Sequence, residues 1–160
     1  MNGRYLTLAG RIRQEIAELE RVAERTQRIW REATTRSDDF LLDAAALNLH
    51  GYYAGIERLF EIITDVVDQA KPTGANWHQE LLRQMTVDVP GIRPAVLSEA
   101  NRNALDEFRG FRHVVRNVYS YNLDPVRIGL LVKNLTTLSA GVHAELLAFT
   151  NFLEEIANES

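Results

Sequence analysis

Residues 124–158 read DPVRIGLLVKNLTTLSAGVHAELLAFTNFLEEIAN and carry the plainest structural signal in the chain. Apolar residues recur every three or four positions, which is the period of an α-helix with one buried face. They are Leu131, Leu135, Leu138, Val142, Leu146, Phe149, Leu153 and Ile156. Asp124 is a predicted N-cap and Pro125 a predicted first helical residue. The sequence therefore predicts a helix from Pro125 to about Asn158.

The same period continues upstream, between a few breakers. Proline occurs only at positions 72, 90, 94 and 125. We expect further helices over residues 4–33, 39–70, 77–85 and 98–118. Ser37 or Asp38 would cap the second of them. Because no segment reads as a strand or a repeat, we expect an all-α fold. It would be an antiparallel helical bundle of four long helices plus one short helix, in a single domain over residues 1–160.

The bulk composition limits the class of protein. The chain is 46% apolar and has a formal net charge of −4, so contact with nucleic acid would need a local basic patch. The absence of cysteine excludes disulfides and thiolate metal sites, and the four histidines are scattered, so we expect no metal and no cofactor. We see no signal peptide and no long apolar run, and we therefore expect a cytoplasmic protein without a membrane partner.

One segment concentrates cationic and polar side chains. Residues 108–123 read FRGFRHVVRNVYSYNL, with three arginines, one histidine and no carboxylate. Arginine is a planar, permanently charged fork suited to phosphate, and tyrosine adds a stacking face. On a regular helix Arg112, Arg116 and Tyr119 would share one face. The apolar residues expected to face the core are Phe111, Val114, Val115 and Val118. The alternative is an ordinary helix end, because arginines complement the dipole of a helix C-terminus.

The spacing in this segment resembles a known motif. Arg112, Asn117 and Tyr119 occupy the positions of R-x4-H-x-Y, the motif of the HEPN superfamily and in particular of the HepT-type toxins. The phrases WHQELL, IRPAVLS, LDEFRGFRHVVRNVY and LDPVR add to the resemblance, which covers about residues 5–155. It implies a HEPN-like, all-helical ribonuclease that uses no metal. In such an enzyme a ribose 2′-OH attacks the adjacent phosphate.

The resemblance also implies roles and partners. Arg112 would hold the phosphate and offset the charge of the transition state, residue 117 would move the proton, and Tyr119 would help to position the RNA. The neighbours expected to contact RNA are Arg109, His113, Arg116 and Tyr121. The implied partners are RNA, with transfer RNA as the substrate class, a second copy of the chain, and a minimal nucleotidyltransferase (MNT) antitoxin. That antitoxin would silence the toxin by attaching AMP to Tyr119.

The chain departs from the motif at residue 117, where asparagine replaces histidine. Asparagine exchanges hydrogen bonds as a neutral imidazole does, but it cannot transfer a proton near neutral pH. The chain would then be an inactive or weakened toxin of a type VII-like pair. The cause would be natural degeneration or a deliberate inactivating substitution, and the intact surroundings favour the second. The alternative is a catalytically silent helical module that binds nucleotide or the nucleotidyltransferase. An antitoxin-like role would suit the acidic charge, but a bundle without a DNA-binding module argues against it.

Helix geometry adds a constraint on this site. Five residues turn about 500° on a regular helix, so positions 112 and 117 lie about 140° apart. They would face one spot only if the helix unwinds or if two chains share the site. Dimerisation of the family that the chain resembles favours the second option. We therefore predict a two-fold contact that involves the helix 98–119.

The histidines outside the motif position have other predicted roles. His113 could move the proton in place of residue 117, but it points about 100° away from Arg112, which favours a supporting role. His50 is predicted to be half-buried and satisfied, with a place along an RNA groove as the alternative. His78 follows Trp77, which we expect to anchor the short helix. His143 has no evident partner. The charged N-terminal residues predict a solvated helix face.

Overall fold

The computed structural model describes residues 2–159, and this part of the chain contains helices and no β-strand. The elements are α1 (Asn2–Arg36), α2 (Asp39–Ile63), the π-helical turn η1 (Thr64–Asp68), α3 (Trp77–Met85), α4 (Glu99–Asn117), the 3-10 turn η2 (Ser120–Asn122) and α5 (Pro125–Glu159). The prediction of an all-α fold with four long helices and one short helix is confirmed. No helix among these residues is long and apolar enough to cross a membrane.

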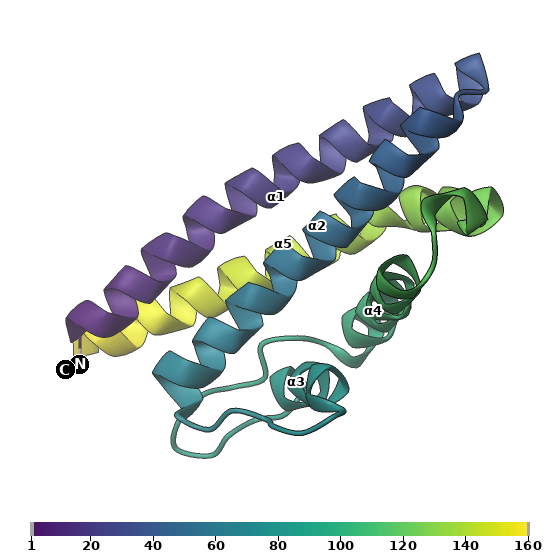
Figure 1. The fold of residues 1–160 in the computed structure, drawn as a ribbon. Coiled ribbons are helices and arrows are strands. Elements are labelled where there is room, and N and C mark those ends of the chain that lie inside the picture. Colours follow the sequence, from purple (N-terminus) through teal and green to yellow (C-terminus); the bar gives the residue numbers. More distant parts are fainter. Residues whose placement is uncertain (1, 160) are drawn as a thin grey trace.

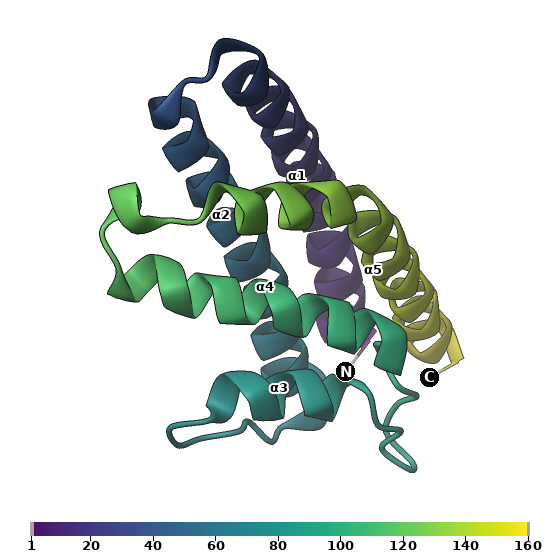
Figure 2. The same cartoon turned by 90° about the vertical axis from the view of Figure 1, so that its right-hand side faces the viewer.

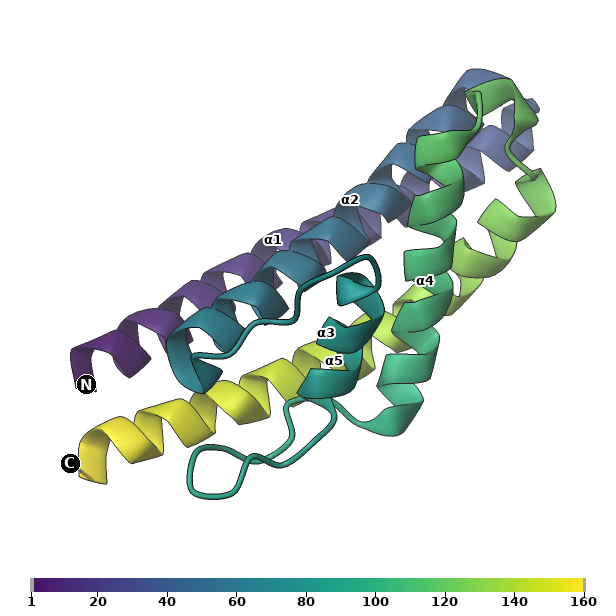
Figure 3. The ribbon, with the colours of Figure 1, turned by 60° about the horizontal axis from the view of Figure 1, so that its bottom comes forward.

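Three of the long helices lie side by side. α1 packs against both α2 and α5 and runs antiparallel to each of them, so both ends of the described chain lie at one end of the molecule (Figure 1). α4 departs from a simple bundle, because it crosses the face formed by α2 and α5 steeply instead of lying along it (Figures 2 and 3). α3 packs against α2 and α4. The crossing therefore brings α2, α3 and α4 together on one side of the molecule.

The helix starts follow the local capping signals. Asp38, and not Ser37, caps α2, because its carboxylate accepts hydrogen bonds from two backbone N–H groups at 2.9 and 3.4 Å. The Ser98 hydroxyl caps α4 by accepting a backbone N–H at 3.2 Å. The Asp124 carboxylate accepts a backbone N–H at 2.9 Å ahead of α5, whose first residue is Pro125. These bonds satisfy N–H groups that the helix itself leaves without partners.

The predicted apolar stripes form the core, with differences in α2. On α2, Leu47 is 67% exposed and lies outside the core, whereas Tyr52 and Tyr53 are fully buried. The reason is that α1, α4 and α5 all cover α2, so a wide arc of it is buried. The expectation that His143 has no partner is wrong, because its Nε2 lies 2.8 Å from the Tyr52 hydroxyl.

The second helix ends earlier than the predicted residue Ala70. The α-helix stops at Ile63, the π-helical turn η1 follows, and Gln69 then takes a left-handed backbone conformation with φ 54°. Asp68, the last residue of η1, is held by a buried side chain from the loop between α3 and α4. A long-range contact therefore accompanies the end of this helix.

That side chain is Arg93, which is fully buried. Its Nε and Nη2 donate to the Asp68 carboxylate at 2.5 and 2.8 Å. Its remaining N–H groups donate to the backbone carbonyls of Val87 at 2.9 Å, Pro94 at 3.0 Å and Gln84 at 3.1 Å. Arg93 thus ties the α3–α4 loop to the end of α2.

Candidate functional site

Six side chains line a hollow of about 240 Å³ between α3 and the second half of α4, which we name the α4 hollow. They are His78, Arg109, Arg112, His113, Arg116 and Asn117. Three are arginines and none is a carboxylate, so the hollow is locally cationic in a protein of net negative charge. The structure therefore brings together all the predicted site residues between positions 109 and 117.

A buried carboxylate next to the α4 hollow holds two of its side chains. Glu57 of α2, whose side chain is 5% exposed, accepts a hydrogen bond from Arg112 Nη1 at 3.2 Å, and its other oxygen lies 2.7 Å from His78 Nδ1. Because an ionised carboxylate only accepts hydrogen bonds, His78 Nδ1 carries the proton in this pair. Arg112 Nη1 and His78 Nδ1 lie 3.4 Å apart because both donate to the same carboxylate, and they do not hydrogen-bond to each other.

Arg112 keeps free hydrogen-bonding capacity after this contact. Its Nε is buried and has no hydrogen-bond partner among the described residues, and no bond within this part of the chain uses its Nη2. An arginine has five N–H donors in a fixed fork that fits the oxygens of a phosphate. Glu57 therefore orients the guanidinium and leaves its Nη2 donors unused within the described residues.

Two other α2 side chains adjoin this cluster. Burial, followed by the positive charges of Arg112 and Arg116, lowers the pKa of His50, which disfavours its protonated form beside the arginines. His50 is half-buried, as predicted, but it is not among the residues that line the α4 hollow. Burial and the nearby Glu57 carboxylate raise the pKa of the Tyr53 hydroxyl.

Asn117 is the last residue of α4 and faces the α4 hollow. Its Nδ2 donates to the backbone carbonyl of His113 at 2.7 Å and lies 3.5 Å from His113 Nδ1. Arg112 and Asn117 of one chain both line the hollow, although the prediction that they do not face the same point of it stays a prediction. The hollow spans a broad arc of the helix surface, and Arg109, His113 and Arg116 fill the arc between the two positions.

The two tyrosines of the segment lie outside the α4 hollow. Helix α4 ends at Asn117 and Val118 is extended (φ −131°, ψ 156°), so the prediction that Tyr119 continues the helical face of the arginines is wrong. Tyr119 and Tyr121 are 73% and 81% exposed, and their rings stack with centroids 5.9 Å apart. Val118 was expected in the core and is 41% exposed for the same reason.

Sequence reasoning missed Glu57 and did not connect His78 with the motif. A signal existed for Glu57, because it lies one residue after Ile56 and four after Tyr53, on the apolar side of α2. Trp77 packs against the core, as predicted, and its ring lies 3.6 Å from the His78 ring. No local pattern shows that α3 meets α4, and the role of His78 therefore emerges only in three dimensions.

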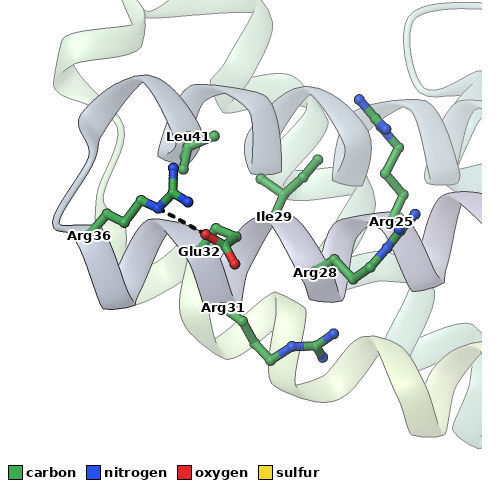
Figure 4. Close-up of a pocket in the computed structure, with 7 residues that line it drawn as sticks. All are labelled: Arg25, Arg28, Ile29, Arg31, Glu32, Arg36 and Leu41. Carbon is green, nitrogen blue, oxygen red and sulfur yellow. Dashed lines mark ion pairs between the residues drawn. The ribbon is translucent and has the colours of Figure 1, made fainter.

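A second and larger hollow lies on α1 near its turn into α2, and we name it the α1 hollow (Figure 4). It is lined by Arg25, Arg28, Ile29, Arg31, Glu32, Arg36 and Leu41. The Arg36 Nε pairs with Glu32 at 3.0 Å, and within residues 2–159 no carboxylate pairs with the other three arginines. These arginines are exposed, as predicted for a solvated face. The sequence did not show that they gather around one hollow.

Comparison with known families fits this architecture. Residues 44–153 match the family model described as HepT-like protein. The chain belongs to the HepT-like family. The matched range of this HepT-like chain includes Glu57 and the whole α4 hollow, whereas α1 and its arginines lie outside it. The resemblance noted in the sequence is confirmed at the level of the family. Comparisons with curated proteins and with solved structures gave no match.

Proposed function

We propose that this HepT-like protein is the toxin of a toxin–antitoxin pair, a ribonuclease that uses no metal ion, acts on transfer RNA and is weakened by Asn117 in the motif histidine position. The observation that supports this function best is Arg112, which a buried Glu57 orients toward a cationic hollow that no carboxylate lines. A phosphodiester is the ligand that suits such a hollow. The test is cleavage of total transfer RNA in the presence of a chelator, with Arg112→Ala expected to abolish it.

The proposed reaction is an internal transesterification of RNA. The ribose 2′-oxygen forms a bond to the adjacent phosphorus, and the bond from phosphorus to the 5′-oxygen of the next nucleotide breaks. Arg112 binds the phosphate and stabilises the negative charge that builds up on it, and Arg116 adds positive charge from the same hollow. Arg109 also lines the hollow, where its Nε pairs with Asp106 at 2.7 Å. His113 and Tyr121 complete the proposed contacts with RNA.

One observation favours a second candidate function, that of a silent module binding nucleotide or the nucleotidyltransferase. The Asn117 side-chain amide donates a hydrogen bond to the carbonyl of His113, and this amide cannot exchange a proton near neutral pH. A module of this kind would bind transfer RNA or nucleotide and release no cleavage product. Cleavage that depends on Arg112 would contradict it.

We also propose that the nucleotidyltransferase antitoxin of the pair silences the toxin at Tyr119. The Tyr119 oxygen would attack the α-phosphorus of ATP, a bond from oxygen to AMP would form, and pyrophosphate would leave. The 73% exposed side chain beyond the end of α4 is open to a partner enzyme. After incubation with the nucleotidyltransferase and ATP, mass spectrometry is expected to find added AMP on the peptide that contains Tyr119.

Variants of the two neighbouring tyrosines test which of them receives the AMP. Tyr119→Phe is expected to abolish the label, and Tyr121→Phe, which changes the adjacent stacked ring, is expected to retain it. Because Tyr119 and Tyr121 lie close together, fragmentation spectra are needed to assign the site. AMP on Tyr121 or elsewhere, with Tyr119 unmodified, would remove the silencing role.

We further propose that the protein is a homodimer whose contact includes the end of α4. Large apolar side chains are exposed there and on the adjoining starts of α2 and α5: Phe40 (84%), Leu47 (67%), Val118 (41%), Val126 (70%) and Leu130 (56%). Light scattering is expected to give about twice the chain mass of 18.2 kDa. The double change Val126→Glu and Leu130→Glu should yield monomers, because burying charge in an apolar contact is costly.

A control for the dimer lies at the opposite end of the molecule. Leu6 in the first turns of α1 is also exposed, at 44%, and Leu6→Glu is expected to leave the mass at the dimer value. A wild-type protein that is strictly monomeric at micromolar concentration would refute the proposed contact.

A further inference from the structure

The α4 hollow lacks the motif histidine but is lined by another histidine, whose ring is held by neighbouring side chains. His78 comes from the first turn of α3, far from the motif in sequence, and lies beside Arg112 because α3 packs against both α2 and α4. Its side chain is 26% exposed and lines the α4 hollow. The ring is flanked on one side by Trp77, with ring centroids 3.6 Å apart. His78 is therefore held in place and still open to a ligand in the hollow.

The buried Glu57 carboxylate sets the chemical state of this ring. It accepts a hydrogen bond from His78 Nδ1 at 2.7 Å, so in the neutral form of the ring the lone pair lies on Nε2. No hydrogen bond within residues 2–159 uses that Nε2 atom. A carboxylate that fixes one imidazole nitrogen so that the other can take a proton is the arrangement used by general-base histidines. Glu57 also binds Arg112, so one carboxylate positions both the phosphate-binding group and the histidine.

We propose that His78, positioned by Glu57, is the general base of the ribonuclease site and does part of the work of the missing motif histidine. This inference rests on the proposed ribonuclease function. As the bond from the 2′-oxygen to phosphorus forms, the 2′-OH proton moves to His78 Nε2. The bond from phosphorus to the 5′-oxygen breaks, and the leaving oxygen takes a proton from water. The products are a 2′,3′-cyclic phosphate and a 5′-hydroxyl.

The other histidines near the motif lack this arrangement. His113 is exposed, and its ring adjoins Asn117 with no carboxylate holding it among the described residues. His50 is half-buried and does not line the α4 hollow. Burial and two arginines also lower the pKa of His50, which opposes proton uptake there. Among the described residues, His78 alone combines a ring held by a carboxylate, an Nε2 without a hydrogen bond and a place in the hollow next to Arg112.

The test compares cleavage of total transfer RNA by variants of the full chain, without metal. His78→Gln, which keeps a polar side chain beside Glu57 but cannot transfer a proton, is expected to lower the rate about 10²-fold or more. His78→Ala is expected to lose a similar factor and to recover part of it when free imidazole is added, because imidazole supplies a base. Gln79→Ala, an exposed change one residue along α3, is expected to stay within about threefold of the wild-type rate.

The same changes are made in the Asn117→His background, where the rate is expected to be higher. If Arg112→Ala abolishes cleavage there while His78→Gln leaves the rate within threefold, His78 is not the base and the ribonuclease function stands. If the Asn117→His chain cleaves nothing, the proposed function and the role of His78 both fail. Imidazole rescue that is confined to His78→Ala separates proton transfer from a purely structural effect of the residue.

Discussion

Asn117→His is expected to raise the rate of transfer RNA cleavage about 10²- to 10⁴-fold, the range that one proton-transferring group contributes to catalysis. Residue 117 already lines the α4 hollow with Arg112, so a histidine there would lie at the same hollow without rearrangement of α4. It would protonate the leaving 5′-oxygen, a step for which the present chain relies on water. The measurement is the initial rate of cleavage in the presence of a chelator.

Two controls give this result its meaning. Asn117→His combined with Arg112→Ala is expected to return the rate to background, because the phosphate then loses its guanidinium. Asn122→His makes the same substitution in the exposed turn η2, outside the α4 hollow, and should change nothing. Equal rates for Asn117→His and the unchanged chain would show that position 117 is not an acid–base site in this protein.

Arg93→Ala is expected to lower the free energy of unfolding by about 3–5 kcal/mol, because it leaves the buried Asp68 carboxylate without its partner. The change also removes the Arg93 donors from the backbone carbonyls of Val87 and Pro94. A loss of this size is a large part of the stability of a single domain. Urea unfolding followed by circular dichroism measures it.

Matched variants test whether the ion pair is the cause. Arg83→Ala removes an exposed arginine of α3 whose contact with Glu80 is 3.8 Å long, and its effect is expected to stay within about 0.5 kcal/mol. Arg93→Ala with Asp68→Ala is expected to cost less than the sum of the two single changes, because the partners are coupled. Strict additivity would show that the buried pair does not act as a unit.

The Asp68–Arg93 pair also connects stability with the site. Arg93 fixes the loop that leads from α3 into α4, and these two helices supply the side chains of the α4 hollow. A loosened loop would change the distance between His78 and Arg112, which depends on how α3 and α4 pack on α2. A destabilised Arg93 variant is therefore a poor choice for assigning catalytic roles, and the variants of His78 and Asn117 are the sharper probes.

The sequence by itself determined the helices and most of the motif. It predicted the bounds of α3 at residues 77–85 and the cap of α5, Asp124, because these signals depend on backbone groups only a few residues away. It also predicted that the site residues between Arg109 and Asn117 lie on one helix, which is α4. These predictions needed only the helical period and local hydrogen bonding.

Only the tertiary structure decided which side chains from other helices contact the motif residues. Glu57 lies 55 residues from Arg112 and 21 from His78, and the three side chains meet only because α3 and α4 both pack on α2. It also placed Tyr119 outside the α4 hollow, because α4 stops at Asn117 and no helical period reaches beyond that end. Helix formation depends on near neighbours, whereas the angle at which helices cross depends on side chains far apart in sequence. That crossing is what gives Arg112 a buried carboxylate and the hollow a second histidine.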